Sequence, residues 1–88
     1  MEKEEMVIRN RLGLHARAAA QLVKAANRFE SEILIEKDGA AVDGKSIMSI
    51  LMLAAQKGSI ISVTTHGIDE KQAIAAIKEL IGNGFGED

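Results

Sequence analysis

The Asp38-Gly39 dipeptide constrains the fold of this chain more than any other feature of the sequence. An Asp-Gly pair tolerates positive φ angles and commonly closes a tight β-hairpin. Ile33 and Ile35 alternate with other residues before the pair, and the short segment 40–42 follows it. The sequence therefore predicts two antiparallel strands joined by a tight turn near the middle of the chain.

Two further strands are expected from short apolar runs on either side of this hairpin. The run "EMVIR", residues 5–9, is bounded by "NRLG" and predicts a first strand. The segment "SIISVTT", residues 59–65, is β-branched and alternating, and it predicts a fourth. With the hairpin strands, they would form a four-stranded, mainly antiparallel sheet.

Three helices are predicted from apolar residues spaced three and four apart. The first covers residues 16–29. A short one follows Ser46, runs apolar to residue 55 and stops by Gly58, and the last opens with Asp69 and Gln72 in capping-box positions. The order β-α-β-β-α-β-α is the split βαβ pattern of α+β sandwiches, with the helices on one face of the sheet. The glycine-rich stretch 82–86 predicts a frayed tail.

Length and composition narrow the class of protein. The 88 residues suffice for one domain, residues 1–88, with one core. There is no cysteine, which excludes a disulfide framework and thiol chemistry. A net charge of -2 and only two aromatic residues argue against nucleic acid as a partner. Because no apolar stretch approaches the roughly 20 residues that span a bilayer, we expect a cytoplasmic protein without membrane association.

A histidine stands where the segment "LGLHARAAAQLV", residues 12–23, enters the first helix. Unpaired backbone N–H groups and the positive end of the helix dipole attract phosphate there. The same field disfavours a protonated imidazole and so helps to keep His15 neutral and nucleophilic. Arg17 adds a planar donor fork suited to phosphoryl oxygens. Spacing alone favours the plainer interpretation, that His15 is a capping or loop residue without function.

The segment "GAAVDGKS", residues 39–46, formally matches the phosphate-loop pattern G-x-x-x-x-G-K-[ST]. A true phosphate loop is one continuous turn between a strand and a helix, whereas Gly39 belongs to the hairpin signal. The chain also has little room for the surrounding parallel sheet and its metal-binding acid. We therefore interpret the match as fortuitous. His66 has no set of ligands nearby, so no metal site is expected.

Two segments resemble one known family. "GLHARAAA" resembles the active-site segment of HPr, the histidine-containing phosphocarrier of the bacterial phosphoenolpyruvate-dependent sugar phosphotransferase system, and "GKSIMSILML" resembles its regulatory-serine segment. Length, element order and the tail "GFGED" also agree, so the resemblance covers essentially all 88 residues. It implies an open-faced β-sandwich that carries phosphoryl groups, is not an independent catalyst and needs no cofactor.

The resemblance also implies roles for the residues around the histidine. His15 is expected to accept a phosphoryl group from enzyme I, itself charged by phosphoenolpyruvate, and to pass it to sugar-specific IIA proteins or domains. Arg17 and the backbone N–H groups of Ala16, Arg17 and Ala18 are expected to steady the phosphoryl oxygens. The family usually has proline where this chain has Ala18. Alanine can fill that place but frees one more backbone donor, so the transfer rate is left open.

A second group of implied residues concerns regulation and docking. Ser46 matches the serine that HPr kinase/phosphorylase modifies in some bacteria, which weakens transfer through His15, and a transcription regulator is a further partner implied by the family. Leu14, Ile47, Met48 and Leu51 fall where the family presents its apolar docking surface. A monomer is expected. A purely regulatory module and a plain interaction domain with an incidental His15 remain as alternatives.

Overall fold

The computed structural model describes residues 1–87, and it contains the predicted order of elements with one addition at the end. The elements are β1 (Glu2–Val7), α1 (Ala16–Ala26), β2 (Glu32–Lys37), β3 (Ala40–Asp43), α2 (Ile47–Met52), β4 (Ile60–His66), α3 (Glu70–Gly82) and the 3₁₀ turn η1 (Gly84–Gly86). None of the helices in these residues is long and apolar enough to cross a membrane.

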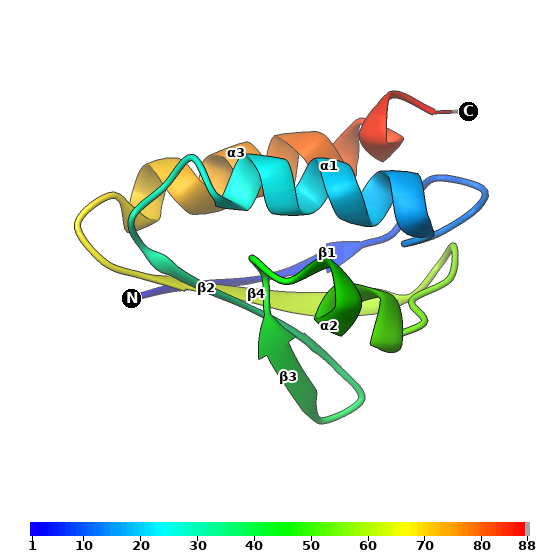
Figure 1. Cartoon of the computed structure of the whole chain (residues 1–88), viewed down its shortest axis with the longest axis horizontal. Helices are drawn as coiled ribbons and strands as arrows, with labels where there is room; N and C mark the ends of the chain where they lie inside the picture. Colours follow the sequence, from blue (N-terminus) through cyan, green and yellow to red (C-terminus); the bar gives the residue numbers. More distant parts are fainter. Residues whose placement is uncertain (88) are drawn as a thin grey trace.

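The four strands form one antiparallel sheet in the order β1-β4-β2-β3. β4 lies inside the sheet: Val63 faces Glu4 of β1 on one side and Ile35 of β2 on the other. Figure 1 shows α1 and α3 side by side over one face of the sheet, and α2 packs against α1 and β3. The other face is left open, which confirms the expected open-faced α+β sandwich.

Alternation along the inner strands explains how the core forms. Ile33 and Ile35 of β2 and Ile61 and Val63 of β4 are fully buried, while their neighbours point to the open face. The hairpin between β2 and β3 turns at Asp38 and Gly39, whose φ angles are 52° and 85°. Two consecutive positive φ angles are what a type I′ turn requires, so the predicted hairpin is confirmed.

Several element boundaries differ from the sequence expectations. β1 begins at Glu2 rather than near residue 5, because residues 2–7 all pair with β4. Glu4, on the same face as the buried Met6, also pairs with Lys78 of α3 at 2.9 Å. α1 ends at Ala26, and the chain to Phe29 continues in tighter turns. α2 stops at Met52, two residues before Ala54 takes a positive φ of 51°.

The capping box predicted at the start of α3 is wrong, although the helix begins where expected. The carboxylate of Asp69 makes no capping bond to its own helix. It accepts hydrogen bonds from the N–H and the hydroxyl of Ser31 and from the N–H of Glu30, at the entrance to β2. These bonds, the Ser31 hydroxyl first, hold the pKa of Asp69 below its ordinary value. Asp69 therefore joins α3 to the chain before β2.

Candidate functional site

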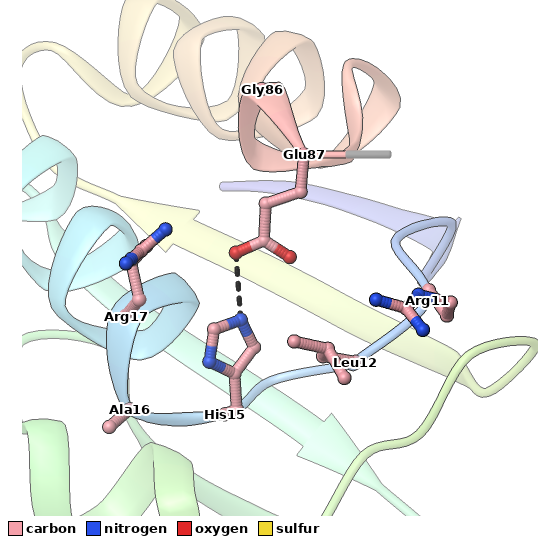
Figure 2. Close-up of a pocket in the computed structure, with 7 residues that line it drawn as sticks. All are labelled: Arg11, Leu12, His15, Ala16, Arg17, Gly86 and Glu87. Atoms are coloured by element: carbon pink, nitrogen blue, oxygen red, sulfur yellow. Dashed lines mark hydrogen bonds and ion pairs between the residues drawn. The ribbon is translucent and has the colours of Figure 1, made fainter.

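A pocket of about 670 Å³ opens at the N-terminal end of α1, where the loop from β1 meets the C-terminal tail. Figure 2 shows the residues that line it: Arg11, Leu12, His15, Ala16, Arg17, Gly86 and Glu87. The structure thus brings together His15 and Arg17, as the sequence predicted. It adds Arg11, Leu12 and two residues of the tail, which the sequence did not indicate.

Gly13 fixes the path of the loop that carries the histidine. Its φ of +67° is unfavourable for other residues, and a Cβ atom at this position would lie 2.5 Å from the carbonyl oxygen of Ala55. The next residue, Leu14, donates its N–H to the same oxygen at 2.8 Å. The loop is therefore held closely against the segment that follows α2, and this contact sets where His15 enters α1.

His15 is the N-cap residue of α1, with extended backbone angles and no capping bond from its side chain. Its carbonyl oxygen accepts the first helical hydrogen bond, from the N–H of Ala19 at 2.8 Å. The N–H groups of Ala16, Arg17 and Ala18 precede that bond, and no residue within 1–87 accepts from them. They form the positive end of the helix dipole directly beside the imidazole.

A partly buried network of hydrogen bonds holds the imidazole from the side opposite to the helix. The Nε2 atom of His15 lies 2.7 Å from Oε2 of Glu87, and Oε1 of the same carboxylate accepts from Nδ2 of Asn10 at 2.9 Å. Asn10 also donates to the carbonyl oxygen of Gly13 at 2.7 Å. In Figure 2 the other ring nitrogen of His15 points toward Ala16 and Arg17. Glu87 therefore occupies Nε2 and leaves Nδ1 open to the helix end.

The charges around His15 favour an anionic ligand. The guanidinium groups of Arg11 and Arg17 both line the pocket, against the single carboxylate of Glu87. The Asn10 amide, followed by His15 and Arg17, lowers the pKa of Glu87, while partial desolvation opposes the shift. Glu87 is therefore ionised at neutral pH, and the pocket still carries one more positive than negative side chain.

The expectation of a frayed C-terminal tail is wrong. Gly84 and Phe85 are buried, and Phe85 takes a φ of 57° within the turn η1, which packs against α3. The contact between Glu87 and His15 spans 72 positions of sequence. Composition had suggested a flexible end, and no local pattern of residues announces a contact over that separation.

Exposed apolar side chains gather on α2 and on the loop before α1. Met48 and Met52 are 70% and 79% exposed, and Leu12 and Ile47 are also exposed. Leu51 is half-buried and contacts the core. Leu14, named with the docking residues from the sequence, is only 4% exposed. That expectation does not hold for Leu14, because its side chain is packed in the core.

Ser46 is the N-cap of α2, as the sequence predicted. Its hydroxyl oxygen accepts from the N–H of Ser49 at 3.3 Å, and the residue is half-buried. The neighbouring Lys45 donates its ammonium group to the carbonyl oxygen of Phe29 at 2.7 Å. Residues 40–43 are strand β3, so the segment 39–46 forms no continuous phosphate loop. The sequence match to a phosphate loop is therefore fortuitous, as expected.

His66, the other histidine of the chain, lies far from this arrangement. It is the last residue of β4, its side chain is exposed, and its Nδ1 atom lies 4.0 Å from Oε1 of Glu70. Within residues 1–87, no three histidine and acidic side chains are grouped so that they could hold a metal ion. The chemistry that the site offers is that of one imidazole beside an anion-binding helix end.

Comparison with known proteins agrees with this geometry. The family model described as the phosphorylation site of the HPr component of the phosphotransferase system matches residues 2–83. The chain belongs to the HPr family. The phosphocarrier protein HPr of Neisseria meningitidis serogroup A is 46% identical over 87 residues, which cover 99% of this chain and 98% of that protein.

Solved HPr structures extend the agreement to the fold. HPr from Thermoanaerobacter tengcongensis superposes with a TM-score of 0.97 at 42% identity, covering 100% of this chain and 99% of that one. A second structure from that organism, described as an HPr dimer, has a TM-score of 0.80. As a member of this family the chain is a phosphocarrier of the phosphotransferase system.

Proposed function

We propose that His15 is the residue that carries the phosphoryl group, and that Nδ1 is the atom that binds it. The observation that supports this most directly is the bond between Nε2 and Glu87 at 2.7 Å, which occupies one ring nitrogen and leaves the other facing the free N–H groups of α1. A phosphoryl group on Nδ1 would lie against a helix N-terminus and close to Arg17, both of which stabilise anions.

The transfer needs no group beyond the imidazole on this chain. The lone pair of Nδ1 forms the bond to phosphorus while the bond between phosphorus and the donor breaks, and the donor keeps that electron pair. Nε2 retains its proton beside Glu87, so the phosphorylated ring is an imidazolium. Passing the phosphoryl group to an acceptor returns the lone pair to Nδ1. The protein is then a carrier within a relay rather than an independent catalyst.

The donor in this proposal is enzyme I, and the acceptors are IIA proteins or domains, as the family implies. Leu12, which lines the pocket, and the exposed Ile47, Met48 and Met52 of α2 offer them apolar side chains. Flexible methionine side chains suit successive partners of different shapes. Binding should be brief and of modest affinity, since a carrier held tightly by either partner could not cycle. The protein would act as a monomeric single domain.

We also propose Ser46 as a regulatory phosphorylation site. A phosphate there would add a charge of about -1.5 to -2 next to Ile47 and close to Met48. A helix N-terminus tolerates that charge, so the expected effect is weaker docking of partners rather than unfolding of α2. The test is a Ser46→Asp variant, which should lower the rate of phosphorylation by enzyme I and leave the unfolding midpoint nearly unchanged.

Intact-mass spectrometry tests the carrier function directly. The protein is incubated with phosphoenolpyruvate, magnesium and its cognate enzyme I, and the mass is measured at alkaline and at acid pH. We expect a gain of one phosphoryl group that is acid-labile, absent from His15→Ala and retained in the control His66→Ala. No gain with an enzyme I that phosphorylates another HPr would contradict the proposal.

The role of Arg17 has a matched control just beyond the other end of α1. Arg17→Met should slow phosphorylation of His15 by about 10²-fold, the usual effect of removing one donor that stabilises developing charge. Arg28→Met removes the same charge two residues after α1 ends, outside the pocket, and should leave the rate within about twofold of wild type. Equal effects of the two variants would mean that only the net charge of the protein matters.

A further inference from the structure

Asn10 is the most deeply buried polar side chain near the site, and its hydrogen bonds have an unusual pattern. The residue is 1% exposed, and its amide nitrogen donates to both Gly13 and Glu87. Its carbonyl oxygen Oδ1 is buried and has no partner within residues 1–87. The orientation of the amide follows from its neighbours, because a rotated amide would place Oδ1 against two acceptor oxygens.

An unpartnered buried carbonyl is unfavourable, so the two donated bonds must account for the presence of an amide here. One of them fixes the turn from residue 10 to Gly13. The other reaches across 77 positions of sequence to the carboxylate that contacts His15. Leucine has the same number and branching of side-chain heavy atoms as asparagine and carries no oxygen that could be left unpaired. What it could not do is hold a carboxylate.

The Glu87 carboxylate is in turn the group that distinguishes the two nitrogens of the imidazole. A carboxylate beside Nε2 binds the neutral ring only when Nε2 carries the proton, which leaves the lone pair on Nδ1. The other charged groups around the ring, the guanidinium groups of Arg11 and Arg17, are donors and cannot accept that proton. Only Glu87, among the side chains that line the pocket, can therefore hold the proton on Nε2.

We infer that Asn10 is a positioning residue for phosphoryl transfer: its buried amide holds Glu87 against Nε2 of His15, so that Nδ1 presents its lone pair to the phosphoryl donor. The inference rests on the proposed function for its consequence in transfer. The arrangement of protons on His15 is a property of the unphosphorylated protein and can be measured without enzyme I.

Nuclear magnetic resonance of the histidine side chains tests this arrangement. Long-range ¹H–¹⁵N spectra distinguish a protonated from an unprotonated ring nitrogen, and they are recorded at about pH 8.5, above the ordinary pKa of histidine. In wild type we expect His15 to carry its proton on Nε2. In Asn10→Leu and in Glu87→Ala, exchange of that proton with water should accelerate about ten- to hundredfold, because a hydrogen bond to a charged group is lost. His66 serves as an internal reference in every spectrum, and Glu79→Gln is the control for loss of a carboxylate near the tail.

The double variant separates positioning from a structural role. If Asn10 acts through Glu87, Asn10→Leu should have no further effect on His15 in the Glu87→Ala background. An effect of Asn10→Leu that persists in that background would show that it acts through the Gly13 turn, and would overturn the inference. So would an Nε2–H exchange rate that Asn10→Leu leaves unchanged. Should Asn10→Leu not fold, Asn10→Ser, which is too short to reach Glu87, replaces it.

The two proposals fail separately. Phosphorylation of wild type by enzyme I with an unchanged exchange rate in the Asn10 variants would remove the role of Asn10 and keep the carrier function. An accelerated exchange rate without any phosphorylation of wild type would do the reverse.

Discussion

Replacing Gly13 by alanine is the sharpest test of how the histidine loop is held. Gly13 has a φ of +67°, and an added Cβ atom would lie 2.5 Å from the carbonyl oxygen of Ala55 and 2.9 Å from Cα of Gln56. Both are backbone atoms, which cannot turn aside as a side chain would. The loop must therefore move away from the segment after α2, and the bond from Leu14 to Ala55 is lost or stretched.

The magnitude follows from two contributions. Alanine in the left-handed region is disfavoured by about 1–2 kcal/mol. Leaving the buried N–H of Leu14 without its acceptor costs about 1–3 kcal/mol. We therefore expect Gly13→Ala to lower the free energy of unfolding by about 3 kcal/mol. For a domain of this size that corresponds to a fall of roughly 15 °C in the midpoint of thermal unfolding.

Gly39→Ala is the matched control. Gly39 also has a positive φ, of +85°, but no atom lies within 4 Å of a Cβ atom built on it. Its substitution should reveal the backbone contribution alone, about 1–2 kcal/mol. Both variants are measured by urea denaturation and calorimetry. Equal destabilisation by Gly13→Ala and Gly39→Ala would refute the claim that close contact with Ala55 holds the loop.

Three further predictions concern the ends of the helices and the tail. Ser46→Ala removes the cap of α2 and should lower the free energy of unfolding by about 0.5–1 kcal/mol, measured by urea denaturation; Ser49→Ala should have a smaller effect, since Ser49 contributes only its N–H to the cap. The pKa of Asp69 is lowered in the folded state, first by the Ser31 hydroxyl, so its contribution to stability is complete above the unfolded pKa and is lost as the pH falls through the folded one; Asp69→Asn should therefore be less stable than wild type at neutral pH, and the difference should begin to shrink only as the pH falls below about 4. Phe85→Ala should cost about 3 kcal/mol, because Phe85 is 3% exposed, whereas a frayed tail would show no change.

Local signals in the sequence predicted the elements that depend on neighbouring residues. The Asp38-Gly39 pair defined the hairpin because its φ angles are a property of those two residues. His15 could be placed at a helix start, because the helical periodicity begins just after it. Turns and helix starts could therefore be predicted from the residues that form them.

Contacts between distant segments could not be predicted in the same way. Asp69 stands in a capping position, yet its carboxylate binds Ser31, because the fold brings a stronger set of donors to it. The tail was expected to fray, yet burial of Phe85 places Glu87 on His15. Periodicity and composition carry no information about which of two distant segments will meet, so half of the candidate site emerged only with the fold.

The order of strands in the sheet has a consequence for how the protein is made. β4 pairs with both β1 and β2, so these two strands have no shared partner until β4 lies between them. A ribosome delivers β1 first and β4 more than fifty residues later, so a nascent chain can pair only β2 with β3 while synthesis continues. The sheet can be completed only after residue 66 has emerged, and the contact between His15 and Glu87 only after residue 87 has. Until then the imidazole of His15 lacks the carboxylate that contacts it in the folded protein.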